Sequence, residues 1–338
     1  MKHSKAWIIW LITTMVILLT NRNPIYLVVV LTGLLVLGAK LSKKNGYKSW
    51  LLQNSRFLGT MIVLSSLINA LFTHTGNLVL FRFPEDWLLI GGKITLESFL
   101  VGMINGLVIG SLYITFNIIN LALSVKQITR LIPNIFHPIA IMITISLTFF
   151  PSIQQRAQEI KEAQMIRGNP MKRISDWSPL LLPLLISSLE NAFLLSESMT
   201  ARGFSSNRES GSEFRITFPI IIAVFIFFSG WVLRLYQYPA YISILCYFFG
   251  ACIIFLALFF ANRKIKLTRF HQETWRKNDT IPAVILLITF VIWTALQLTS
   301  NLASTNYSPN PSLSMPSIQV LGILPSLSPW VPMFFFDK

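Results

Sequence analysis

Nine apolar stretches, separated by short and often basic segments, most restrict what this chain can fold into. A transmembrane helix needs about 20 apolar residues, with a range near 17–25. Most of the nine reach that length, and only 12% of the 338 residues are charged, against about 25% in soluble domains. The sequence therefore predicts an all-α fold, a polytopic membrane helical bundle with roughly six to eight crossings. The stretches lie at about 6–20, 24–39, 56–73, 97–122, 134–150, 178–195, 217–233, 241–261 and 281–299.

The first two stretches predict a tight helical hairpin, because only residues 21–23 separate them and Pro24 suits the first turn of a helix. The basic N-terminus followed by an apolar run is also typical of a signal peptide. However, Leu18-Leu19-Thr20-Asn21 offers no small-x-small cleavage site. We therefore expect the first stretch to remain as an uncleaved span.

The net charge of +15 comes from Lys and Arg that cluster between the apolar stretches. Cytoplasmic loops of membrane proteins carry such an excess under the positive-inside rule, so the partner is a lipid bilayer and no nucleic acid is expected. The charges at 74–96 are mixed, and this segment is predicted to lie outside. The protein is thus predicted to be multi-pass in a bacterial inner membrane.

The basic segments 124–130 and 151–177 create a conflict, because 134–150 cannot cross once between two cytoplasmic loops. Either 134–150 and 178–195 both cross and place five Lys or Arg outside, or neither crosses fully. The charge favours the second solution, with the block packed at the cytoplasmic face. Apolar residues at three- and four-residue spacing predict an amphipathic helix at 153–168, which Pro151 opens and Gly168 closes.

A pattern of Glu, four residues and then Arg-Gly occurs twice, 35 residues apart. The copies are Glu162 to Arg167-Gly168 and Glu197 to Ala201-Arg202-Gly203. Glycine after a helix allows a left-handed turn, and arginine on the last turn is favoured by the helix dipole. The guanidinium can then hold a carboxylate of another protein with two hydrogen bonds. Glu162 and Glu197 can orient these arginines or balance their charge.

These paired motifs resemble the Ala-Arg-Gly signatures of the transmembrane (T) component of energy-coupling-factor ABC transporters, a cobalt-permease-like family. Ala201-Arg202-Gly203 matches intact, whereas Ile166 stands where the first copy usually has Ala. Residues 147–151, and less specifically 91–97, are also similar to the family. The resemblance covers about 20–265.

The resemblance implies that Arg167 and Arg202 each bind one of two ABC-type ATPase subunits, with ATP and Mg used by those partners. It also implies a small membrane substrate-capture (S) subunit, moved through coupling helices at about 153–168 and 180–203. The imported substrate would be a vitamin or a metal ion such as cobalt or nickel. No cofactor is expected on this chain.

Several motifs needed for other functions are missing from the sequence. There is no G-x-x-x-x-G-K-[ST] nucleotide site, and Cys246 and Cys252 have no His or Asp nearby, so neither catalytic nor metal-ligating residues are predicted. The alternative is a self-sufficient secondary transporter or conventional permease for a small solute. It would use polar residues at mid-membrane, such as Asn105, Asn117 and Asn120. Asn117 and Asn120 are one turn apart and can equally bind a neighbouring helix.

Gly102, Gly106 and Gly110 are spaced for close helix packing, which could involve the capture subunit. The predicted organisation has four parts. These are N-terminal transmembrane helices at 1–150, a coupling region at 151–210, C-terminal transmembrane helices at 211–299 and a flexible Ser/Pro-rich tail at 300–338.

Overall fold

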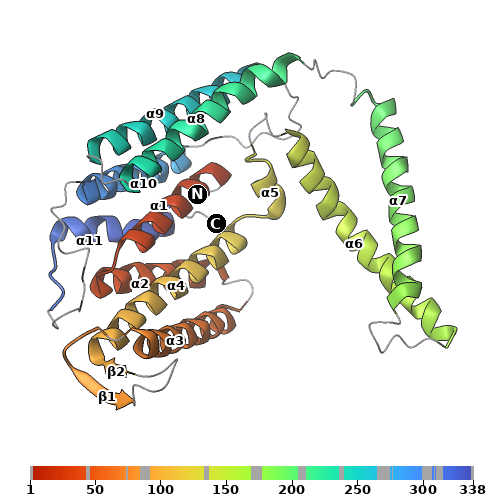
Figure 1. Cartoon of the computed structure of the whole chain (residues 1–338). Helices are drawn as coiled ribbons and strands as arrows, with labels where there is room; N and C mark the ends of the chain where they lie inside the picture. The colour runs from red at the N-terminus through yellow and green to blue at the C-terminus, as the bar shows by residue number, and fades with distance from the viewer. Residues whose placement is uncertain are drawn as a thin grey trace. The chain divides into compact units, whose positions relative to one another are not determined.

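The described secondary structure is almost entirely α-helical, which confirms the predicted fold class (Figure 1). Contacts within the chain form two compact units, residues 1–131 with 271–338, and residues 132–270. The predicted division into four parts stays a prediction. The computed structural model describes residues 3–42, 46–73, 75–83, 92–132, 137–168, 177–204, 211–235, 240–264, 275, 277–298, 307, 309 and 315–335.

The first unit is a bundle of long helices with several short helical elements, most of them near the C-terminus of the chain. The predicted helix break at residues 21–23 is confirmed: Pro24 is at the start of the second helix, and the Asn23 side chain accepts a hydrogen bond from the Ile25 amide. The tight packing predicted for the first two helices against each other is wrong, because both pack mainly against other helices of the unit. The elements are α1 (Ser4–Thr20), α2 (Pro24–Leu41), α3 (Tyr47–Phe72), α4 (Leu96–Ala122), α5 (Val125–Thr129), α10 (Lys277–Leu298), α11 (Val320–Ser326), the 3₁₀ turn η4 (Ser328–Trp330) and α12 (Val331–Phe334).

Large aromatic side chains form the centre of this unit. Trp7 and Trp10 of α1 are buried together with Trp293 of α10, whose indole Nε1 donates to Thr20 Oγ1 at 2.7 Å. Indole N–H groups usually find such a partner when they are buried. The contact fixes the end of α10 against the end of α1, so a helix far away in the sequence completes the N-terminal bundle.

A β-hairpin between α3 and α4 was not predicted from the sequence. It consists of β1 (Val79–Phe83) and β2 (Gly92–Thr95), paired antiparallel. The carboxylate of Glu97, in the first turn of α4, accepts hydrogen bonds from the amides of Asn77 and Leu78, each at 3.0 Å. The alternation that marks a strand is short here, and residues 84–91, including Gly91 of the family-like segment, lie outside the described residues.

The end of the chain differs from the expectation of a flexible tail. Asn23 Nδ2 donates to Ser317 O at 3.1 Å, and Lys40 Nζ donates to Met333 O at 2.7 Å. Asn23 precedes α2 and Lys40 lies in its last turn, so residues 317–333 run along the whole length of α2.

This C-terminal segment is held by a close fit between aromatic rings and glycines. A Cβ added to Gly33 of α2 would lie 2.5 Å from Trp330 Nε1, and one added to Gly322 would lie 2.9 Å from the Tyr26 ring. The Ser/Pro content suggested disorder. The contacts could not be predicted from the sequence, because they depend on which faces of two distant segments pack together. Residues 299–306 and most of 308–314 lie outside the described part of the chain.

The second unit contains α6 (His137–Ile166), α7 (Ser178–Ala201), α8 (Gly211–Leu235) and α9 (Ala240–Lys264). The predicted helix start at Pro151 is wrong, because α6 continues through this proline. Proline removes one backbone hydrogen bond and costs roughly 3 kcal/mol in a helix interior. Phe149 and Ile153, on either side of it, both line a groove shared with α7, so the apolar face of α6 is continuous across the proline.

Five described helices are long and apolar enough to cross a membrane by length and composition. The chain is therefore a multi-pass membrane protein. Among the five is α7, whose sequence we expected at the cytoplasmic face. Composition does not distinguish the two placements of 134–150 and 178–195, so the cytoplasmic placement stays a prediction. The five are α2, α3, α4, α7 and α10.

Candidate functional site

The second Arg-Gly motif ends α7 in a complete Schellman turn. The amide of Gly203 donates to Thr200 O at 2.9 Å, and that of Phe204 donates to Met199 O at 3.1 Å. Gly203 has φ +76°, which glycine adopts without steric cost. The Phe204 and Met199 side chains line the same groove, the apolar contact that usually accompanies this turn. The helix therefore ends at Ala201, with Arg202 as its C-cap residue.

The first motif ends α6 by the same means. The amide of Gly168 donates to Met165 O at 3.1 Å, and Gly168 has φ +85°. Nothing lies within 4 Å of the position that a Cβ on Gly168 would take. A left-handed glycine therefore follows each motif arginine, as the sequence predicts. We call the two structures the Arg167 end and the Arg202 end.

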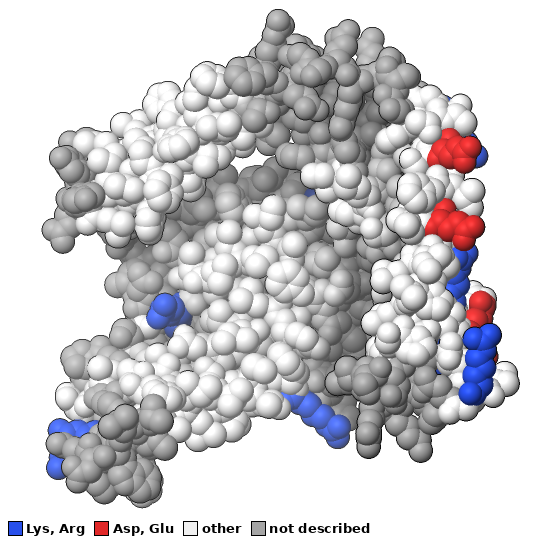
Figure 2. All heavy atoms as spheres, turned by 45° about the vertical axis from the view of Figure 1, so that its right-hand side comes forward, with Lys and Arg blue, Asp and Glu red and all other residues white. Residues whose placement is uncertain are grey.

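Both arginines are exposed, but their neighbours differ. Ile166, which replaces the usual alanine, is 87% exposed beside Arg167, and Ala201 is the exposed neighbour of Arg202. The charged side chains of α6 and α7 gather along one side of the pair and the adjoining surface is neutral (Figure 2). The two ends therefore differ in the apolar surface that they expose beside the arginine.

The two glutamates of the motifs are also exposed. Glu162 Oε1 accepts a hydrogen bond from Gln158 Nε2 at 3.3 Å, one turn earlier on α6. This contact stays within α6, and a supporting role for Glu162 and Glu197 stays a prediction.

Helices α6 and α7 pack antiparallel, with Arg156 at the middle of their contact. Its Nη2 donates to Asn191 Oδ1 at 3.2 Å and its Nη1 to Ser187 O at 3.4 Å. The role of Arg156 was missed in the sequence, where it was counted only as a cytoplasmic charge. Its position between Ile153 and Ile160, on the apolar face of the helix, was the available signal.

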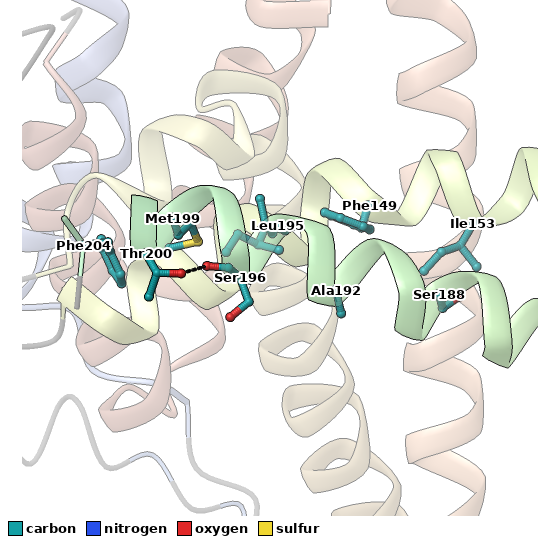
Figure 3. A pocket seen from close by; sticks show the side chains of 10 residues that line it. Phe149, Ile153, Ser188, Ala192, Leu195, Ser196, Met199, Thr200 and Phe204 are labelled. Carbon is teal, nitrogen blue, oxygen red and sulfur yellow. Dashed lines mark hydrogen bonds between the residues drawn. The ribbon is translucent and has the colours of Figure 1, made fainter. Parts of the chain in front are cut away.

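An apolar groove of about 420 Å³ lies between α6 and α7 on the side of Arg156 that leads to the Arg202 end. Figure 3 shows Ile153 near Ser188 at one end of the groove and Phe204 at the other, beyond Met199. The Thr200 hydroxyl donates to Ser196 O at 2.6 Å, so its hydrogen bond is made within α7. Packing of α6 against α7 is thus tight at Arg156 and open towards the Arg202 end.

In the first unit, the three glycines of α4 pack against α3. A Cβ on Gly102 would lie 2.6 Å from Ser65 O, and one on Gly106 would lie 2.6 Å from Ile62 Cα. Gly110 faces Leu58. Close helix contact is what their spacing suggested, but the neighbour is α3 of this chain rather than a capture subunit.

Asn117 also binds α3. Its Nδ2 donates to Asn54 Oδ1 at 3.1 Å, and its Oδ1 accepts from Trp50 Nε1 at 3.4 Å. A polar residue of an apolar helix thus has partners within the bundle, as expected for helix packing. Within the described residues, no three His, Cys, Asp or Glu side chains lie together as a metal site, and Cys246 and Cys252 are free thiols.

The fold places the chain in a class, the polytopic all-α membrane proteins. Within it, a family model described as CbiQ, cobalt transport protein, matches residues 2–213. This range includes both Arg-Gly ends. The chain therefore belongs to the CbiQ cobalt transport family, the family of transmembrane components of energy-coupling-factor transporters, as its resemblance implied.

Curated relatives agree with this family. A protein from Bacillus selenitireducens named energy-coupling factor transporter transmembrane protein EcfT is 27% identical over 236 residues, 65% of this chain and 85% of the relative. EcfT of Acidaminococcus fermentans is 30% identical over 185 residues, 51% and 67% of the two chains. EcfT of Bacillus subtilis is 28% identical over 180 residues, 49% and 66%.

Proposed function

We propose that this chain is the energy-coupling transmembrane subunit of an importer in the bacterial inner membrane. It transmits ATP-driven motion of two ATPase subunits to a small membrane protein that captures the substrate. The chain itself catalyses no reaction and binds no cofactor, and the ATP and Mg are used by the ATPases. The substrate is a vitamin or a metal ion, selected by the capture subunit.

The observation that carries this proposal is the position of two exposed arginines at opposite ends of one antiparallel helix pair. Arg167 follows the end of α6, Arg202 follows the end of α7, and Arg156 contacts Asn191 between them. Along the pair the two ends are about 33 Å apart at 1.5 Å per residue. Two separate receptors can therefore each bind one end, which supports one ATPase per arginine.

The chemistry of each end suits a carboxylate-containing groove on an ATPase. An arginine that follows the last turn of a helix places its positive charge next to carbonyl groups that have no partner within the helix, which is favourable. Its five N–H donors can hold a carboxylate with two hydrogen bonds. Because Gly168 and Gly203 end the helices at once, the arginines are not covered by the following chain at the residues that the structure describes. Movement of the ATPase groove is then transmitted along the axis of the bound helix.

The test replaces both arginines. Arg167→Ala with Arg202→Ala should reduce copurification of the ATPases, or substrate uptake, by at least about tenfold, since each charge-assisted contact contributes about 1.5–3 kcal/mol. Lys161→Ala, an exposed basic residue of the same helix pair, is the matched control and should keep both activities. Full uptake and full complex yield in the double variant would contradict the proposed role of the two arginines.

A further inference from the structure

Arg156 occupies an unusual position on the contact face of α6. The half-buried residues of α6 recur every three or four positions, as do those of α7, and these two faces meet. Within the described ranges of the two helices, Arg156 is the one charged residue among them. The half-buried positions are Ala140, Ile141, Ile145, Phe149, Ile153, Arg156, Ala157, Ile160 and Gln164 on α6, and Pro179, Leu180, Leu184, Ser187, Ser188, Asn191, Leu195 and Met199 on α7.

The partners of Arg156 are themselves fixed. Asn191 Nδ2 donates to Ser187 O at 2.7 Å, the same carbonyl that accepts from Arg156 Nη1. This orients the amide so that its Oδ1 faces the guanidinium, at 3.2 Å from Nη2. The guanidinium therefore donates hydrogen bonds to two successive turns of α7 at once, which an apolar side chain cannot do.

The contact is equally far from both Arg-Gly ends. Arg167 is 11 residues after Arg156 (167 − 156), and Arg202 is 11 residues after Asn191 (202 − 191). At 1.5 Å per residue, each end lies about 17 Å from the contact, in opposite directions. Sliding one helix past the other by a single turn would change the spacing of the ends by about 5 Å.

Apolar contacts alone resist such a slip weakly, because Ile, Leu and Phe pack in neighbouring registers at similar cost. A polar contact inside an apolar helix seam, by contrast, specifies one register, since any other leaves a half-buried charge without its acceptors. The groove between Arg156 and the Arg202 end adds little packing of its own to hold the register.

We propose that Arg156, with Asn191 and Ser187, fixes the register of α6 against α7 and so sets the spacing of the Arg167 and Arg202 ends. Arg156 is a positioning residue: it contacts neither ATPase nor substrate. The inference rests on the proposed function for its effect on transport, while the register itself is a property of this chain alone.

The register is measured by spin-label distances in the complete transporter. Labels at Gln158→Cys and Ser198→Cys, exposed positions on the two helices, are introduced after Cys246→Ser and Cys252→Ala. With Arg156 we expect one narrow distance distribution. Arg156→Met, which keeps the length and removes the donors, should add a second population shifted by about 5 Å. The ratio of native to shifted register should fall about tenfold, as loss of a charge-assisted hydrogen bond implies.

Conservative and partner variants make the result specific. Arg156→Lys should restore part of the native population, since the ammonium keeps the charge and can still donate hydrogen bonds but lacks the planar fork of arginine. Asn191→Leu should reproduce the effect of Arg156→Met, and the two together should add little to either alone. Lys161→Met, which removes an exposed charge from the same helix, should leave the distribution unchanged. An unchanged distribution in Arg156→Met would overturn the proposal.

The second readout is substrate imported per ATP hydrolysed. Arg156→Met should lower this ratio about fivefold or more while the ATPases still copurify, because both ends remain but their spacing varies. An unchanged ratio with a shifted register would overturn the link to transport. If the Arg167 and Arg202 double variant retained uptake while Arg156→Met still shifted the register, the proposed function would fail and the register assignment would stand.

Discussion

The pairs α3–α4 and α6–α7 are both antiparallel and both apolar, yet they pack by different means. In α3–α4, glycines of α4 let the two backbones approach, and Asn117 binds Asn54 across the contact. Many residues of α4 are buried, including Gly102 and Gly106. None of the α7 residues is buried, and α6 and α7 leave a groove between them.

The difference indicates that α3 and α4 are held by close backbone contact within the chain, whereas α6 and α7 meet more loosely. Both pairs expose apolar side chains, since Val63 and Phe72 of α3 are 59% and 62% exposed. Apolar side chains such as Leu185 and Phe193 of α7 are 65% and 66% exposed. Their burial must come from lipid or from another protein, because a patch of this kind is unfavourable in water. The predictions below test this contrast, beginning with the closely packed pair α3–α4.

The largest effect is expected at Gly106. Gly106→Leu would bring a side chain against the α3 backbone, with its Cβ already 2.6 Å from Ile62 Cα. We expect a loss of about 3 kcal/mol or more in stability, seen as a lower Tm in detergent micelles, because a backbone cannot move aside as a side chain can.

Gly59→Leu is the matched control on α3. Nothing lies within 4 Å of a Cβ at Gly59, and leucine is about 0.8 kcal/mol better than glycine inside a helix. Its Tm should therefore stay the same or rise. An equal fall in Tm for both variants would show that α3 and α4 do not pack through Gly106.

A smaller loss is expected where the C-terminal segment meets α2. Gly33→Val would displace Trp330, whose Nε1 lies 2.5 Å from the position of an added Cβ, and should cost about 2 kcal/mol. Trp330→Ala alone should also destabilise by removing buried aromatic surface. Since the alanine creates room for the valine, the double variant should be more stable than the sum of the two changes predicts. Strict additivity in a double-mutant cycle of Tm values would contradict the contact.

The same segment makes a topological prediction. Phe335 lies at the end of α2 that carries Lys40, the basic end, whereas Ser317 lies beside Asn23 at the other end. In whole cells, Ser317→Cys should react with an impermeant maleimide, and Phe335→Cys should react only after the membrane is opened. Reaction of both from the outside would return residues 315–335 to the expected external tail.

The sequence predicted those features that depend on one segment at a time. The separation of the first two helices follows from apolar length and Pro24, and the left-handed ends follow from Gly168 and Gly203. Features that depend on two distant segments were missed. Whether Pro151 ends a helix depends on packing against α7, and the fit of Trp330 at Gly33 joins residues almost 300 positions apart. Arg156 belongs to this second group, because its partners lie on another helix.

The smallest effect is expected on the outer face of α7. Phe193→Ser should change the Tm of the isolated subunit by little, equivalent to less than about 0.5 kcal/mol, because the ring has few contacts within the chain to lose. In the assembled transporter the same change should lower complex yield or the Tm measurably, since the partner or lipid that covers Phe193 loses apolar contact. A large fall in the isolated subunit would show that α7 is packed within the chain after all, and the contrast with α3–α4 would be lost.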